Sequence, residues 1–345
     1  MIQRIRIFLL PWLLVIALAA APALQHVWAT ALQVRNSLSD GDSGHIRFRS
    51  ANALAGGLLD GRPITPSAVD GELTLPGQCT RPFPAVVVLH GSLGVSKMQH
   101  DYARALNRKC YAVLVVDSFT GRGVRSTVAN QLAVTTESMV IDAYAALVLL
   151  QSDPAIDRNS IALAGWSKGG TAVELAMSNL VWRKFAPNAA RFAAHIAFYP
   201  WCGEQTFSER NTGAPILFIL AKRDDWVSPS ACSDYAMHLR DLGVAIRVES
   251  FDAGHAFDSP GSVHLFFPDA IVSARCRYEP RSDSFRDIDS QKIMPWAQFN
   301  RFFSACSSWG AHIQSDARAA SAARGIMFDF LDQNLKTSIS GGPSS

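Results

Sequence analysis

Apolar runs alternate with helical patterns through the middle of this chain, and this alternation limits the possible fold more than any other feature. Continuous runs rich in β-branched residues predict buried strands at 85–89, 112–116, 161–164, 195–198, 216–220 and 245–251. Helical patterns separate or follow them at 97–109, 136–150, 170–180 and 229–242. Strand alternating with helix predicts an α/β fold with a mostly parallel central sheet that helices cover on both faces. Ligands of such sheets bind at the carboxyl ends of the strands.

The sequence on either side of this region is less regular. Short apolar pieces at 45–48 and 73–75, in a polar and glycine-rich lead-in, predict one or two edge strands. Residues 258–309 read as an irregular, aromatic and charged insertion, followed by an amphipathic helix at about 311–335 and a disordered tail at 338–345. No internal repeat or low-complexity linker is visible, so we expect residues 30–337 to form a single domain.

Residues 1–29 have the composition of an export signal peptide. Arg4 and Arg6 precede an apolar run at 7–21, and small residues follow it. The alternative is an uncleaved membrane anchor, because 7–24 nearly reaches the roughly 20 apolar residues that a spanning helix needs. The short apolar core favours cleavage, which predicts a periplasmic or secreted protein that contacts a membrane only through this segment if it is retained.

The overall composition is that of a globular protein, with 48% hydrophobic and 18% charged residues. The formal net charge is +3, and removing Arg4 and Arg6 with the export segment leaves +1. This small excess implies no nucleic-acid partner.

The six cysteines fall in three sequential pairs, none of them in a CxxC motif or beside a histidine cluster, so a zinc site is not expected. In an oxidising compartment they are candidates for disulfides. One pair precedes neighbouring predicted strands, one lies near the carboxyl ends of strands, and one encloses most of the insertion. This placement predicts the bridges Cys79–Cys110, Cys202–Cys232 and Cys276–Cys306.

A serine between two glycines stands at the junction of a predicted strand and a predicted helix, in Gly165-Trp166-Ser167-Lys168-Gly169. This is the pattern of a nucleophile elbow, in which the turn is so sharp that neighbouring side chains would collide without glycines. The alternative is a chance match in a glycine-rich loop. The strand before it and the helix after it favour Ser167 as a nucleophile.

A serine hydroxyl needs a base to remove its proton, and both partners follow in the required order. Asp224 and Asp225 come just after the predicted strand 216–220, and His255 comes just after the strand 245–251. Each therefore lies at the same edge of the sheet as Ser167. The residues leave open which of the two aspartates is the acid.

Several motifs together resemble the dienelactone hydrolase family of α/β-hydrolases, over about residues 83–335. They are VVLHGSLG, VDSFTGRG, GWSKGG, YPWCG, AKRDDWVSP and DAGHAFD. The resemblance implies Ser167 as nucleophile, His255 as base and Asp224, rather than Asp225, as acid. Dienelactone hydrolases proper use cysteine as the nucleophile, whereas this chain has a serine. The resemblance therefore implies hydrolysis of an ester-like bond, but it does not extend to the lactone substrate for which the family is named.

The tetrahedral oxyanion of such a reaction needs two backbone N–H donors. One is expected from Lys168, directly after the nucleophile. The other is expected from the loop after strand 85–89, which matches the family's oxyanion loop, with Ser92 as first choice and Leu93 as the alternative.

Arg122 and Arg125 follow another strand and are candidates to clamp a substrate carboxylate, unless they are ordinary solvated or Asp-paired loop arginines. Trp166, Trp201 and Trp226 flank the motifs and either line a substrate pocket or pack in the core. No nucleotide-binding loop is present, so no cofactor is expected.

The sequence thus predicts an exported serine hydrolase that cleaves a small ester or lactone through an acyl-enzyme. An acyltransferase or a peptidase using the same triad is an alternative within enzymes, and a non-catalytic hydrolase-like binding protein is the alternative outside them.

Overall fold

The structure is a computed structural model that describes residues 33–59, 63–206 and 211–335. All described helices and strands belong to one compact unit. The predicted export segment, residues 1–29, and the predicted tail, residues 338–345, lie outside the described residues.

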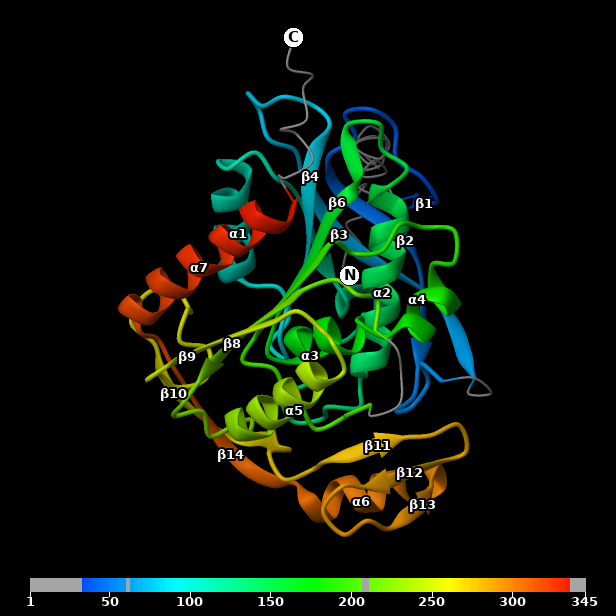
Figure 1. The fold of residues 1–345 in the computed structure, drawn as a ribbon, viewed down its shortest axis with the longest axis vertical. Helices are drawn as coiled ribbons and strands as arrows, with labels where there is room; N and C mark the ends of the chain where they lie inside the picture. Colours follow the sequence, from blue (N-terminus) through cyan, green and yellow to red (C-terminus); the bar gives the residue numbers. More distant parts are fainter. Residues whose placement is uncertain (1–32, 60–62, 207–210, 336–345) are drawn as a thin grey trace, which may run out of the picture. The chain divides into compact units, whose positions relative to one another are not determined.

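A twisted central sheet organises this unit (Figure 1). Its order across the sheet is β1 (Val34–Arg35), β2 (Gly44–Ala53), β3 (Ile64–Thr74), β5 (Ala112–Asp117), β4 (Phe83–Leu89), β6 (Ile156–Trp166), β7 (Ala194–Phe198), β8 (Ile216–Ala221) and β9 (Ile246–Phe251). The strands from β5 to β9 run parallel to one another, and β3 pairs antiparallel with both β2 and β5. The predicted mostly parallel sheet is confirmed.

Helices cover both faces of the sheet, as predicted. On one face α1 (Lys97–Asn107) and α7 (Ala317–Leu335) pack over alternate residues of the parallel strands, which form one core. On the other face α2 (Thr136–Leu150), α3 (Lys168–Leu175), α4 (Asn179–Phe185) and α5 (Pro229–Asp241) enclose a second, larger core. Strand β4 is buried along its whole length, which explains its unbroken apolar sequence.

Three predicted elements differ from the structure. The edge strands are longer than expected, since β2 and β3 form a hairpin in register over ten residue pairs. The helix expected at 170–180 is two helices, because Ser178 accepts a hydrogen bond from the Val181 N–H and starts α4. The helix expected from residue 311 begins at Ala317, and the preceding residues belong to strand β14 (Ser308–Gln314).

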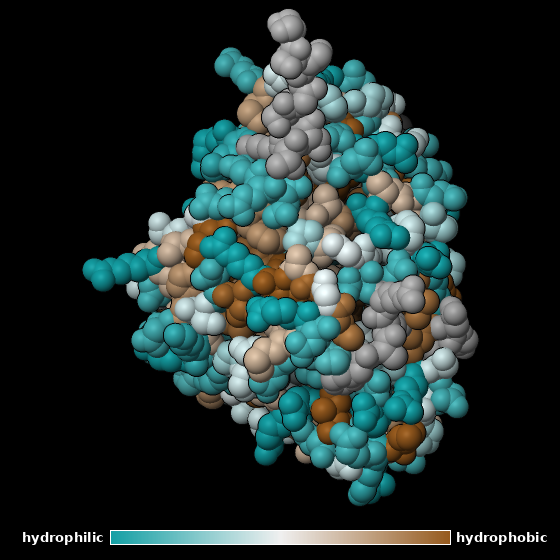
Figure 2. All heavy atoms as spheres, in the orientation of Figure 1, coloured by the Kyte–Doolittle hydropathy of each residue, from teal (hydrophilic) through white to brown (hydrophobic). Residues whose placement is uncertain are grey.

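The insertion at 258–309 is also more regular than expected. Strand β10 (His264–Val272) pairs antiparallel with β14, and β11 (Tyr278–Pro280), β12 (Ser284–Asp287) and β13 (Ile293–Pro295) form a small sheet beside helix α6 (Phe299–Cys306). Aromatic side chains pack between that sheet and α6 as a small separate core. Figure 2 shows a mainly hydrophilic face with separate hydrophobic patches.

All three predicted disulfides are present: Cys79–Cys110, Cys202–Cys232 and Cys276–Cys306. Their Cα atoms are 5.7, 5.0 and 5.1 Å apart, within the range that bridges span. Such bridges persist in oxidising compartments, so the chain has the disulfides of a periplasmic or extracellular protein. Among the described residues, no helix combines the length and apolar character that crossing a membrane requires.

Candidate active site

Ser167 occupies a strained turn between strand β6 and helix α3. Its φ of 53° and ψ of −117° lie outside the usual regions for a residue with a side chain. The flanking glycines make this turn possible, because a Cβ on Gly165 would lie 2.2 Å from the Gly169 carbonyl oxygen and one on Gly169 would lie 2.6 Å from the His90 carbonyl oxygen. The sequence Gly165–Gly169 therefore has the geometry of a nucleophile elbow.

Among the three residues predicted as a triad, His255 lies within hydrogen-bond distance of both Ser167 and Asp224. His255 Nε2 is 2.9 Å from Ser167 Oγ, and His255 Nδ1 is 2.6 Å from Asp224 Oδ2. The Asp224 side chain is fully buried and that of His255 nearly so. Asp224 Oδ1 accepts hydrogen bonds from the backbone N–H groups of Trp226 and Val227, which hold the carboxylate in place.

Asp225 has a different partner from Asp224. Its carboxylate lies 2.7 Å from His312 Nδ1 and accepts a second hydrogen bond from the His312 backbone N–H. About half of its side chain is exposed. Asp225 therefore fastens β14 to the loop that carries Asp224, whereas Asp224 faces His255.

The loop after β4 lies against the nucleophile. A Cβ on Gly91 would lie 3.2 Å from Ser167 Cβ, so only glycine permits this approach without displacement. His90 is buried, which lowers its pKa, and its neutral ring bridges the Gly91 carbonyl and the Ser118 N–H. No described residue accepts a hydrogen bond from the N–H groups of Ser92 or Leu93.

Lys168 begins helix α3, where backbone N–H groups have no partner within the helix. Its side chain is buried, and Nζ donates to the backbone carbonyl of Gln131 at 2.7 Å and to its Oε1 at 3.2 Å. Ser92 Oγ donates to the same Oε1. Gln131 thus links the two residues expected to form the oxyanion hole, a role with no recognisable sequence signal.

Two cavities meet at Ser167, and Ser92 and Trp226 border both. The first, of about 60 Å³, is lined by Lys168 and by aromatic residues that include Trp201, Tyr278, Phe299 and Phe303. The second, of about 90 Å³, lies between the oxyanion loop and His255, with Leu93, Met98, Tyr199 and Ile313 in its wall. Tyr278, Phe299 and Phe303 come from the insertion, whose contribution the sequence did not reveal.

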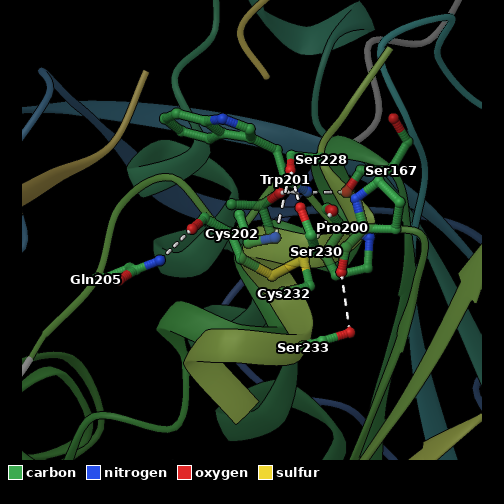
Figure 3. Close-up of a disulfide and its surroundings, with 12 residues drawn as sticks. Ser167, Pro200, Trp201, Cys202, Gln205, Ser228, Ser230, Cys232 and Ser233 are labelled. Atoms are coloured by element: carbon green, nitrogen blue, oxygen red, sulfur yellow. Dashed lines mark hydrogen bonds between the residues drawn. A yellow bond between two sulfur atoms is a disulfide. The ribbon is translucent and has the colours of Figure 1, made fainter. Parts of the chain in front are cut away.

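The Cys202–Cys232 disulfide lies next to Trp201 (Figure 3), which lines the first cavity. It joins the segment after β7 to helix α5, which follows the loop containing Asp224. Trp201, next to this bridge, donates its backbone N–H to Thr171 Oγ1 of the nucleophile helix and its ring N–H to the Ser273 carbonyl. The bridge therefore connects the segment that carries Trp201 with the helix that follows the Asp224 loop.

For Arg122 the structure supports the alternative of an Asp-paired arginine over the carboxylate clamp. Its guanidinium pairs with both carboxylate oxygens of Asp142 and donates to Asn52 Oδ1 and to the carbonyls of Ser118 and Ala51. Both members of the ion pair are buried. Every guanidinium N–H is engaged, so none is available to a substrate.

Arg125 and Trp166 also differ from a simple substrate-binding role. Arg125 is exposed and borders neither cavity that contains Ser167. Trp166 borders the second cavity, but the residue is 1% exposed, and its ring stacks on Phe198 and donates its Nε1–H to Asp258. The alternative of core packing therefore describes Trp166 better than substrate contact.

Within the described parts of the chain, no group of three or more His, Cys, Asp or Glu side chains is arranged to hold a metal ion.

A mostly parallel sheet with helices on both faces, and a sharp serine turn between strand β6 and helix α3, form the fold of an α/β-hydrolase. The chain belongs to the dienelactone hydrolase family, whose family model matches residues 69–278, more than half of the sequence. As a member of this family, it is a hydrolase that acts on ester bonds. No curated protein has significant sequence similarity to it.

Solved structures share the fold at low sequence identity. A dienelactone hydrolase-like promiscuous phosphotriesterase from metagenomic libraries has a TM-score of 0.51 and 17% identity, covering 84% of this chain and 99% of its own. The protein m3DLH has a TM-score of 0.50 and 18% identity, with the same coverage of 84% and 99%. An esterase from Thermogutta terrifontis with bound propionate has a TM-score of 0.44 and 14% identity, covering 61% and 86%. The first two likenesses establish the fold.

Proposed function

We propose that this chain is an exported serine hydrolase that cleaves small esters or lactones through an acyl-enzyme on Ser167. The observation that carries the proposal is the hydrogen-bonded series Ser167 Oγ, His255 Nε2, His255 Nδ1 and Asp224 Oδ2, with distances of 2.9 and 2.6 Å. Membership of the dienelactone hydrolase family, whose members hydrolyse ester bonds, also supports the proposal.

His255 accepts the Ser167 proton as the oxygen attacks the ester carbonyl, and Asp224 stabilises the resulting imidazolium and fixes its orientation. The backbone N–H groups of Lys168 and Ser92, or Leu93 in place of Ser92, donate to the oxyanion. His255 then protonates the leaving alcohol. Water repeats the sequence on the acyl-enzyme and releases the acid.

The two cavities take different halves of the ester in this proposal. The leaving alcohol must lie beside His255 to receive its proton, which assigns it to the cavity that His255 borders. The acyl group then enters the cavity lined by Lys168 and the aromatic residues. Its volume of about 60 Å³ is only a few times the roughly 10–15 Å³ that one water molecule needs. Short acyl chains are therefore the expected substrates.

A series of p-nitrophenyl esters with two to twelve acyl carbons tests this proposal, with Ser167→Ala as the matched control. We expect kcat/KM to be highest for acyl chains of about four to six carbons, and a burst of nitrophenol equal to the enzyme concentration where deacylation is slow. Adding amine or alcohol acceptors and peptide substrates distinguishes acyl transfer and proteolysis from hydrolysis. An inactive wild type, or an active Ser167→Ala variant, contradicts the proposal.

Export by removal of the N-terminal segment is the second part of the proposal. It is supported by the basic start, apolar run and small residues of 1–29 and by the three disulfides. Mass spectrometry of protein from the producing cell's envelope or medium should find the mature N-terminus between Ala20 and Thr30. Membrane-bound material that retains Met1 would instead favour the anchor.

A further inference from the structure

Three residues other than glycine, in the proposed triad or close to it, have a backbone with positive φ. They are Ser167 itself, with φ of 53°, Tyr199, with φ of 35°, and Ala256, with φ of 56°. Tyr199 follows β7, whose Phe198 carbonyl accepts a hydrogen bond from the Ser167 N–H, and Ala256 directly follows His255. Such conformations persist only where surrounding contacts hold them.

One buried carboxylate contacts the segments that carry all three. Asp258 is 3% exposed and lies two residues after Ala256. Its Oδ1 accepts a hydrogen bond from the Tyr199 hydroxyl at 2.5 Å, and its Oδ2 accepts one from the Trp166 ring N–H at 2.7 Å. Trp166 immediately precedes Ser167. Asp258 therefore joins the chain just before the nucleophile, the strained end of β7 and the loop of the histidine.

A third donor anchors the same carboxylate to a helix. The Tyr102 hydroxyl, from α1, donates to Asp258 Oδ2 at 2.8 Å. Burial raises the pKa of both Tyr102 and Tyr199 well above the usual value for tyrosine, and the Asp258 charge acts in the same direction, so both phenols remain hydrogen-bond donors. The carboxylate thus accepts hydrogen bonds from three buried side chains.

We propose that Asp258 is a positioning residue, which holds the strained backbone at Ser167, Tyr199 and Ala256 through its bonds to Trp166 and Tyr199. The inference rests on the proposed triad, but it concerns a side chain that touches neither substrate nor the reacting atoms. Of the residues bonded to Asp258, Tyr199 links it most directly to the proposed triad, because the Tyr199 ring also contacts the His255 ring edge-to-face, with centroids 4.8 Å apart.

Two tyrosines provide a matched pair for the test. Tyr199→Phe and Tyr102→Phe each remove one buried hydroxyl that donates to Asp258 and keep the aromatic ring. Only Tyr199 has a strained backbone and contacts His255, whereas Tyr102 lies in a regular helix. A role in stability alone would affect both variants alike.

The measurements are kcat and KM for a short-chain aryl ester, the rate of fluorophosphonate labelling at Ser167, and the midpoint of unfolding. We expect similar unfolding midpoints for the two variants, a fall in kcat of at least tenfold with unchanged KM for Tyr199→Phe, and a kcat within twofold of wild type for Tyr102→Phe. Asp258→Asn should lower kcat about 100-fold and slow labelling without moving it from Ser167.

Equal effects of the two tyrosine substitutions on kcat, or a change in Tyr199→Phe confined to KM, would overturn the proposal. The tyrosine pair decides the question even where Asp258→Asn does not fold. Failure of the proposed function has a separate signature, because Ser167→Ala would then retain activity and labelling whatever the tyrosine variants do.

Discussion

Asp224 and Asp225 are adjacent in sequence, yet their surroundings predict opposite consequences of the same substitution. Asp224→Asn places an amide beside His255 Nδ1, where the carboxylate oxygen now lies at 2.6 Å. The two backbone N–H groups that bond Oδ1 keep the carbonyl oxygen of the new amide on their side. The amide N–H₂ then faces Nδ1, which becomes an acceptor, so Nε2 carries the proton and cannot accept one from Ser167.

The expected size of this effect follows from the tautomer change. A wrong tautomer with otherwise intact geometry lowers kcat by about 10⁴ in serine proteases, which corresponds to about 5 kcal/mol of activation free energy. Asp225→Asn removes only a half-exposed carboxylate that bonds His312. An exposed pair of this kind contributes about 0–1 kcal/mol to stability, so we expect kcat/KM within about threefold of wild type.

Both variants are assayed with the same short-chain aryl ester, with circular dichroism and thermal unfolding as controls for folding. Asp224→Asn should fold like wild type and lose nearly all turnover, while Asp225→Asn should keep it. If Asp225→Asn loses more activity than Asp224→Asn, or if folded Asp224→Asn keeps a tenth of wild-type activity, the assignment of the acid is wrong.

Two further predictions concern charges around the site. Arg122→Met should lower the free energy of unfolding by about 3–5 kcal/mol, because it leaves the Asp142 carboxylate buried without its cation. Substitution of the exposed Arg125 by Met should change the free energy of unfolding by less than about 0.5 kcal/mol. If Arg122→Met instead raises KM selectively for esters that carry an acidic group, Arg122 binds a substrate carboxylate after all. Burial lowers the pKa of Lys168 in the folded protein to about 8, whereas a lysine in the unfolded chain has a pKa of about 10.4. Between these two pH values the unfolded state binds more protons than the folded state. The wild type should therefore become more stable as the pH rises through this range. Urea unfolding at pH 7, 9 and 10.5 should show this gain, up to about 3 kcal/mol, relative to Lys168→Met, and a constant difference between the two proteins would contradict it.

The sequence predicted the central fold because its strongest signals are local. Strand β4 is apolar at every position, and the helix expected at 136–150 has the observed bounds of α2. The order of Ser167, the aspartates and His255 placed them at one edge of the sheet, since parallel strands end together. The order of these residues in the sequence could not, however, predict the distances between their side chains.

The errors arose where distant residues decide the structure. Residues 311–314 continue the amphipathic pattern of α7, but their pairing with β10 makes them a strand. The helix begins only after Asp316, which caps it by accepting hydrogen bonds from the Arg318 and Ala319 N–H groups. Arg122 finds its partner Asp142 in the middle of α2, where Asp142 is the only charged residue after the first turn. That isolated charge was a readable sign of a buried ion pair.

The walls of the catalytic cavities were the least predictable part of the site. Tyr278, Phe299 and Phe303 reach the first cavity from an insertion whose small sheet and helix pack through their own aromatic core. No periodic pattern in 258–309 indicated which aromatic residues would face Ser167. The length of the insertion and its cysteine pair indicated only that the segment is held together.

The central claim is that Ser167 is a nucleophile activated by His255, and covalent labelling tests it most directly. Purified protein is treated with a fluorophosphonate, digested and mapped by mass spectrometry, alongside Ser167→Ala and His255→Ala. We expect one adduct per wild-type molecule, on the peptide containing Ser167, none on Ser167→Ala, and labelling at least 100-fold slower on His255→Ala. An adduct on another residue, or equal labelling of Ser167→Ala and wild type, would contradict the account.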